Sequence, residues 1–254
     1  MIQRGMKQTH IGNNNMKITL DKKYYKSDSI NNGRIVASFF EKLATNIFKQ
    51  AYKYATENKK ITGRAELPLI FGERNIYSTI AVAINEITPI HISEWAFNPS
   101  EHSNIEKSRR VDFWCLNRDG KGGNPLNYFI EVKKGWYCLN KASNEAFQAV
   151  INKDIIELVQ QTKDLKSISP EWDDVDDIFL GISIIHGYYD NDKLYYNEHN
   201  VRENIYQNLD ADSNLQLITS TWHVPRDIES QWDKSKCKFI TIAGIVTNKT
   251  NDSK

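Results

Sequence analysis

Residues 109–134 are the stretch that most constrains how this chain can fold. Their sequence, RRVDFWCLNRDGKGGNPLNYFIEVKK, contains two short apolar runs joined by a segment of turn-forming residues. The pattern predicts a β-hairpin. Three ionisable residues interrupt the apolar runs, namely Asp112 in the first run and Glu131 and Lys133 in the second. Charged residues in a pattern that is otherwise typical of a buried strand often mark a functional site.

The two-residue periodicity of a strand determines which of these side chains share a face. The strand predicted at 127–134 places Glu131 and Lys133 on the same face. The strand predicted at 109–116 places on one face Arg110, Asp112 and Trp114, and on the other Val111, Phe113 and Cys115. Antiparallel pairing of the two strands could bring Asp112 beside Glu131 and Lys133.

An acid-x-Lys triplet is weak evidence by itself, because this chain contains six of them. They begin at Asp21, Glu57, Asp119, Glu131, Asp164 and Asp252. Only the triplet Glu131-Val132-Lys133 lies inside an apolar strand that follows another strand with an isolated acid. This setting, rather than the triplet, makes the hairpin a candidate site.

Two converging carboxylates repel each other unless a cation lies between them. A hard divalent ion with oxygen ligands is one solution, and a neighbouring lysine such as Lys133 can then hold a metal-bound water or compensate the charge of a phosphate. A cross-strand network of Asp112, Glu131 and Lys133 on a solvated face of the sheet is the alternative. The spacing does not decide between the two.

Two further acids are candidates to join the site. A helix predicted at about 72–86 carries Glu73 at the head of its apolar stripe, where the side chain is either an inward ligand or an exposed residue favoured by the helix dipole. A strand predicted at 90–97 carries Glu94 on the face that it shares with Ile90, Ile92 and Ala96. Either acid could point inward.

The remaining periodic segments predict one α/β domain over residues 31–250, preceded by a polar, loosely ordered segment, 1–30. Helices are expected at 34–58, 141–166 and 199–208, and strands at 178–189, 215–224 and 238–249. The helix at 141–166 carries Gln148 and Gln161 as polar candidates near the site.

Composition excludes several classes of protein. Lys plus Arg (33) nearly balances Asp plus Glu (32), so any basic surface must be local. The three cysteines show no CxxC spacing, and their odd number suggests reduced thiols and argues against a structural zinc site. The N-terminus has no apolar signal region, and no run approaches the roughly 18 apolar residues of a membrane span. We therefore expect a cytoplasmic protein with no membrane partner.

Around Glu73, Asp112, Glu131 and Lys133 the chain resembles the PD-(D/E)xK nuclease superfamily, whose fold is called restriction-endonuclease-like. FGERNIYSTIAVAI is similar to its first core helix, RRVDFW to its Asp strand and YFIEVKK to its ExK strand, with a helix and the strand IFLGISII following. Val111 stands where the superfamily has the Pro of its name. The resemblance covers about residues 70–190. It implies a central mixed β-sheet flanked by helices, with an extra N-terminal helix and extra C-terminal strands.

The resemblance also implies the roles of individual residues. Asp112, Glu131 and the backbone carbonyl of Val132 would bind Mg²⁺, for which Mn²⁺ can substitute. Lys133 would position or activate the attacking water. Glu73 would complete the metal shell or orient Lys133. The accessory positions are Glu94, Gln148 and Gln161.

The reaction implied is hydrolysis of a phosphodiester, with DNA favoured over RNA, as in a restriction or defence endonuclease. Arg109, Arg110 and Lys134 would contact nucleic acid, or are ordinary solvated charges. Many nucleases of this fold act as dimers, which makes a homodimer a candidate state. The alternatives are a non-catalytic member of the fold that binds nucleic acid or a protein, and a hydrolase acting on another phosphorylated substrate.

Overall fold

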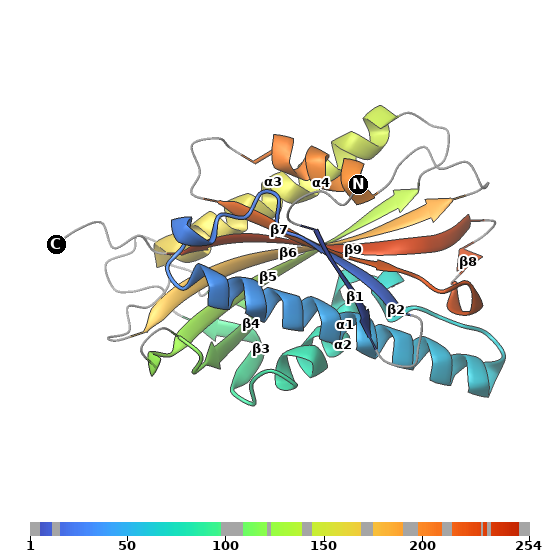
Figure 1. Ribbon diagram of the computed structural model, residues 1–254, viewed down its shortest axis with the longest axis horizontal. Coiled ribbons are helices and arrows are strands. Elements are labelled where there is room, and N and C mark those ends of the chain that lie inside the picture. The colour runs from blue at the N-terminus through green and yellow to red at the C-terminus, as the bar shows by residue number, and fades with distance from the viewer. Residues whose placement is uncertain are drawn as a thin grey trace.

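In the described part of the chain, nine strands form one mixed sheet (Figure 1). The computed structural model describes residues 6–11, 16–97, 109–120, 123–138, 144–168, 175–189, 198–209, 215–229, 231–232 and 235–248. The strands are β1 (Met6–Ile11), β2 (Met16–Asp21), β3 (His91–Phe97), β4 (Arg109–Asn117), β5 (Leu126–Cys138), β6 (Asp176–Tyr189), β7 (Gln216–His223), β8 (Gln231–Trp232) and β9 (Ser235–Asn248). Their order is β1-β2-β7-β9-β6-β5-β4-β3, and β8 pairs with β9.

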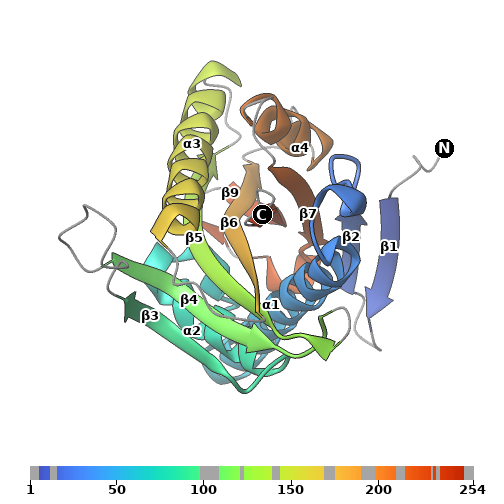
Figure 2. The same cartoon turned by 90° about the vertical axis from the view of Figure 1, so that its left-hand side faces the viewer.

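Helices cover both faces of this sheet (Figure 2). The helices are α1 (Gly33–Thr62), α2 (Glu73–Asn85), α3 (Asn144–Ile168) and α4 (Glu198–Gln207), with short 3-10 turns at Ser27–Ser29, Pro68–Ile70 and Arg226–Ile228. Helices α1 and α2 pack on one face and α3 and α4 on the other. The predicted α/β class, a central mixed sheet flanked by helices, is confirmed. Within the described residues, no helix is long and apolar enough to cross a membrane.

Helix α1 forms because apolar side chains recur along it at three- and four-residue steps. Phe39, Phe40, Leu43 and Ile47 on this stripe are almost completely buried. The helix ends at Gly63, which adopts the left-handed conformation with φ of 76° and donates its N–H to the carbonyl of Lys59. Tyr54, near the C-terminal end of the helix, is 48% exposed.

The N-terminal segment differs from the expectation of a loosely ordered region. Strand β2 pairs antiparallel with β7, and β1 pairs with β2 at the edge of the sheet. Met16, Ile18 and Leu20 of β2 are each only 3% exposed. Their alternation buries one face of the strand, although the polar residues around them dominate the local composition.

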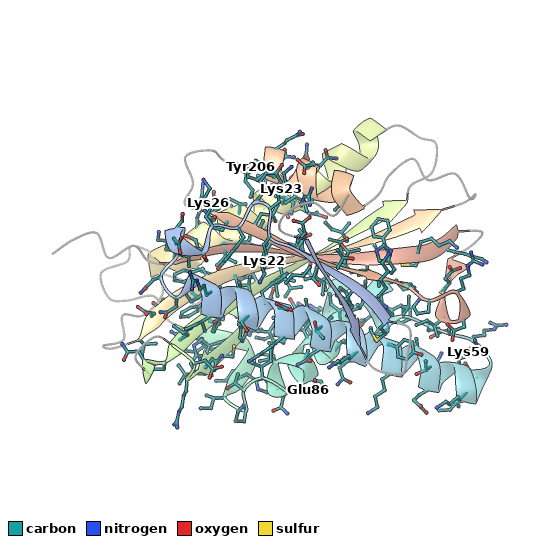
Figure 3. All side chains as sticks on the ribbon, in the orientation of Figure 1. Lys22, Lys23, Lys26, Lys59, Glu86 and Tyr206 are labelled. Atoms are coloured by element: carbon teal, nitrogen blue, oxygen red, sulfur yellow. The ribbon has the colours of Figure 1, made fainter. Side chains whose placement is uncertain are left out.

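The loop after β2 attaches this N-terminal part to α4 (Figure 3). The Tyr24 ring stacks on Tyr206 with centroids 3.6 Å apart, and the Lys23 Nζ lies 3.0 Å from a carboxylate oxygen of Glu203. Arg202 forms a buried ion pair with Asp21. This face of the sheet is therefore closed by contacts between segments far apart in sequence.

Strands β5 and β6 are the one parallel pair among the described strands, and α3 connects them. The helix lies close to β6 because Gly181 has no side chain. A Cβ built there would lie 2.8 Å from Leu158 Cγ and 2.9 Å from Thr162 Oγ1. Gly181 is the register partner of Glu131. The close approach of α3 therefore occurs directly beside one residue of the predicted site.

We predict that Gly181→Ala destabilises the protein by about 1–3 kcal/mol, because the added methyl group must push α3 away from the sheet. Ser183→Ala, two residues along the same face of β6, is a matched control. Among the described residues the buried Ser183 Oγ has no hydrogen-bond partner, so its removal should be neutral or stabilising. Chemical denaturation of the two variants checks both signs. Equal destabilisation by the two would contradict the prediction.

Candidate functional site

The β4–β5 ladder stops where the predicted acids begin. In the described residues, the two strands pair from Asn117 and Leu126 up to Phe113 and Ile130. Beyond that point β4 continues beside β3, and β5 continues beside β6. Asp112 and Glu131 are the next residues along each strand. The Val132 N–H donates to Asp112 Oδ2 at 2.8 Å, so a side chain replaces a backbone partner.

The regular alternation of β4 breaks at Asp112. Phe113 packs in the core on the side of α1 and α2, whereas Val111 packs with Leu165 of α3 on the other side. The prediction that Val111 and Phe113 share a face is therefore wrong. The neighbouring strand is irregular at the same level, because Glu94, which lies opposite Asp112, has φ of 50°. A left-handed non-glycine residue inside a strand is uncommon.

Helix α2 contributes a direct contact to Asp112. The Tyr77 hydroxyl donates to Asp112 Oδ1 at 2.6 Å. The Tyr77 ring packs edge-on against Phe113, with centroids 5.1 Å apart. Both oxygens of the Asp112 carboxylate are thus held by donors, one from the helix and one from strand β5.

Glu131 is an acid in a buried position, with 9% of its surface exposed. Burial raises the pKa of its carboxyl, and the charge and hydrogen bonding of Asp112 raise the pKa further. The positive charge of Lys133 acts in the opposite direction. Asp112 and Glu131 therefore interact as a close pair of carboxylates, an arrangement that antiparallel pairing of the two predicted strands allowed.

Glu73 also belongs to this group. Burial raises the pKa of its carboxyl, the charge of Lys133 lowers it, and the charge of Asp112 raises it. A second acid, Asp154 of α3, raises the pKa of Glu73 as well. Glu73 is the first residue of α2 and is half-buried. The structure thus brings together Asp112, Glu131, Lys133 and Glu73, which we call the candidate site.

Glu94 lies outside the candidate site. Its side chain is exposed, and so are Ile90 and Ile92, which share the face that was expected to be buried. The prediction of Glu94 as an inward acid is therefore wrong. Strand β3 is the edge strand at this end of the sheet.

The other predicted positions have different outcomes. Gln161 is half-buried on α3, and its Oε1 has no hydrogen-bond partner among the described residues. Arg110 is exposed on β4. The side chains of Gln148 and Arg109 lie outside the described residues.

Lys134 has a structural contact that the sequence did not predict. Its Nζ donates to the carbonyl oxygen of Ile70 at 2.6 Å, just before α2. Burial lowers the pKa of Lys134 to about 8, against the opposing effect of the Glu73 charge. The side chain therefore holds the start of α2 against the sheet, which differs from the expected role as a surface cation for nucleic acid.

The chemistry of the donor set suits a hard divalent ion. Carboxylate and carbonyl oxygens are the ligands that Mg²⁺ accepts, together with several waters. The N–H and C=O of one strand residue point toward the same neighbouring strand. The Val132 carbonyl is therefore directed to the side where its N–H meets Asp112. Within the described residues, no three His, Cys, Asp or Glu side chains form a group that could hold a metal ion.

Tyr77 and Asp154 were not among the site residues predicted from the sequence. Tyr77 carried a usable signal, since it lies four residues after Glu73 and the two therefore share one face of α2. Asp154 carried none, because its place beside Glu73 depends on how α3 packs across the sheet.

No protein-family model, curated protein or solved structure matches this chain. What the candidate site does must therefore be inferred from its own residues.

The raised pKa of Glu131 predicts how the stability of the metal-free protein depends on pH. A carboxyl whose pKa is raised by folding binds more protons in the folded state. Its contribution to stability is complete below the ordinary Glu pKa of 4.5 and is lost as the pH rises toward the raised value. Glu131→Gln cannot ionise, so it should reduce this loss by about 1 kcal/mol or more, since one pKa unit corresponds to about 1.4 kcal/mol.

Urea denaturation of the two proteins between about pH 5 and about pH 8, with a metal chelator present, measures this effect. Parallel profiles for the wild-type protein and Glu131→Gln would show that Glu131 does not carry the predicted proton.

Proposed function

We propose that this protein is a metal-dependent nuclease that hydrolyses phosphodiester bonds, and that residues of about 70–190 form a restriction-endonuclease-like core. The observation that carries the proposal is the close pair of carboxylates, Asp112 and Glu131, at the point where β4 and β5 separate. Two acids in a largely buried position repel each other, and a divalent cation relieves that repulsion.

The order of the elements supports the proposal. Helix α2 with Glu73 comes first, then β4 with Asp112, then β5 with Glu131 and Lys133. Helix α3 follows, and β6 lies parallel to β5. The same order of helix and strands occurs in the PD-(D/E)xK nuclease superfamily, which the sequence resembles.

Each residue of the candidate site has a distinct role in the proposal. Asp112, Glu131 and the Val132 carbonyl would hold Mg²⁺ or Mn²⁺. When bound, such an ion lowers the pKa of water and stabilises charge on the phosphate. Lys133, on the same face of β5 as Glu131, would orient the attacking water and the phosphate by donating hydrogen bonds. Glu73 would orient the Lys133 ammonium, whose charge already acts on the Glu73 carboxylate.

DNA is the favoured substrate, because the resemblance is to restriction endonucleases. The exposed guanidinium of Arg110, two residues before Asp112, would contact a phosphate of the backbone. Lys134 is left out of this role because of its contact with Ile70.

The test is cleavage of plasmid, linear DNA and RNA by the purified protein with Mg²⁺ or Mn²⁺. Wild-type protein should cleave at least one of them, and a chelator should abolish the cleavage. Asp112→Ala should be inactive because it removes a metal ligand. Lys133→Ala should lose at least about 10²-fold in rate, the usual effect of removing a positioned hydrogen-bond donor from the reacting groups.

Two control variants show whether these losses are specific. Glu57→Ala changes another acid-x-Lys triplet, on the exposed surface of α1, and should cleave like the wild-type protein. Lys134→Met changes the neighbour of Lys133 on the opposite face of the strand, so it should lose stability through the Ile70 contact. Thermal unfolding identifies variants that have lost their fold.

Undiminished cleavage by Asp112→Ala would overturn the proposed site. Failure of the wild-type protein to cleave any of the three nucleic acids with either ion would favour the non-catalytic alternative.

A further inference from the structure

We propose that Tyr77 is a positioning residue that orients the Asp112 carboxylate for metal binding, an inference that rests on the metal-dependent function proposed above. Nothing in the sequence resemblance points to this residue. Its role follows from its contact with Asp112 and from the way the fold fixes its ring.

The geometry of Asp112 is set by two donors on two different elements. Tyr77 of α2 donates to Oδ1 at 2.6 Å, and the backbone N–H of Val132 in β5 donates to Oδ2 at 2.8 Å. Because each oxygen accepts one of these hydrogen bonds, the two bonds together fix the orientation of the Asp112 carboxylate plane. Each oxygen of a carboxylate has two acceptor sites, so these two bonds do not by themselves prevent Asp112 from binding a metal.

The Tyr77 hydroxyl is itself held in place by packing. The ring is half-buried and lies edge-on against Phe113, which is fully buried. The start of α2 is held in turn by the bond from Lys134 to the Ile70 carbonyl. The hydroxyl therefore meets Asp112 with little loss of side-chain freedom.

Asp112 needs such support because its surroundings are acidic. Glu131 and Glu73 both interact with its negative charge. A fixed donor on Oδ1 restricts rotation of the Asp112 side chain, and hydrogen-bonded metal ligands of this kind bind metals more tightly.

The test measures metal affinity directly, in the absence of nucleic acid. Mn²⁺ binding to the full chain is followed by isothermal titration calorimetry and by the electron paramagnetic resonance signal of free Mn²⁺. Tyr77→Phe keeps the ring and removes the hydroxyl. Its dissociation constant for Mn²⁺ should rise by about 10-fold or more, the usual effect of losing a hydrogen bond to a metal ligand.

Tyr128→Phe is the matched control. Tyr128 lies on β5, its ring is fully buried, and its hydroxyl has no hydrogen-bond partner in the described part of the chain. This variant removes the same atom from the same type of residue. Its Mn²⁺ affinity should equal that of the wild-type protein.

A second pair of variants isolates the donor from the packing. Replacement of Tyr77 by 4-aminophenylalanine retains an N–H donor, and replacement by 4-fluorophenylalanine retains the size without a donor. The amino variant should bind Mn²⁺ like the wild-type protein, and the fluoro variant should bind as weakly as Tyr77→Phe. This comparison holds even if Tyr77→Phe folds poorly, because both rings fill the same space.

The outcomes separate the two proposals. Mn²⁺ binding by the wild-type protein with equal affinity in the amino and fluoro variants would overturn the role of Tyr77 and leave the proposed function standing. Absence of Mn²⁺ and Mg²⁺ binding by the wild-type protein would overturn the metal site itself, and the inference with it.

Discussion

The hydrogen bond from the Val132 N–H to the Asp112 carboxylate is the contact on which the candidate site depends. A backbone N–H at the interior of a sheet is costly to leave unpaired, so two strands can separate only where another acceptor takes over. Asp112 supplies that acceptor. Because the Asp112 carboxylate replaces a backbone acceptor of β4, it lies between the two strands and next to Glu131. The irregular backbone at Glu94 and the change of face between Val111 and Phe113 occur at the same level of the sheet.

The separation of the strands is supported from both faces of the sheet. On one side α2 contributes Glu73 and Tyr77, and Lys134 fixes the start of the helix. On the other side α3 lies close to the sheet over Gly181, beside Glu131. The result concentrates several carboxyl groups in a small volume close to Lys133 and Lys134. Such a concentration opposes folding, and proteins commonly tolerate that cost at functional sites.

Local sequence pattern was enough to predict the position of some acids of the site, but not of others. Glu131 and Lys133 were placed correctly because the period of a strand is two residues, and a single step puts both on one face. Glu73 and Glu94 each share a face with apolar residues, so local pattern alone made both of them candidates. Which one is near Asp112 depends on the packing of α2 against the β4–β5 pair and on the exposure of β3 at the edge of the sheet. Neither is encoded in the periodicity of a single segment.

The sequence by itself determined the α/β class and most of the helices and strands, because these follow from local hydrophobic periodicity. It also made Asp112 a possible neighbour of the Glu131-Val132-Lys133 triplet, because a turn-forming segment joins the two strands. It misjudged β1 and β2, where polar composition concealed an alternating strand. Only the tertiary structure decided that Asp112 is held by Tyr77, that Glu73 is the neighbouring acid, and that Lys134 anchors α2. Those contacts join segments more than 30 residues apart, and their geometry is set by how whole elements pack together.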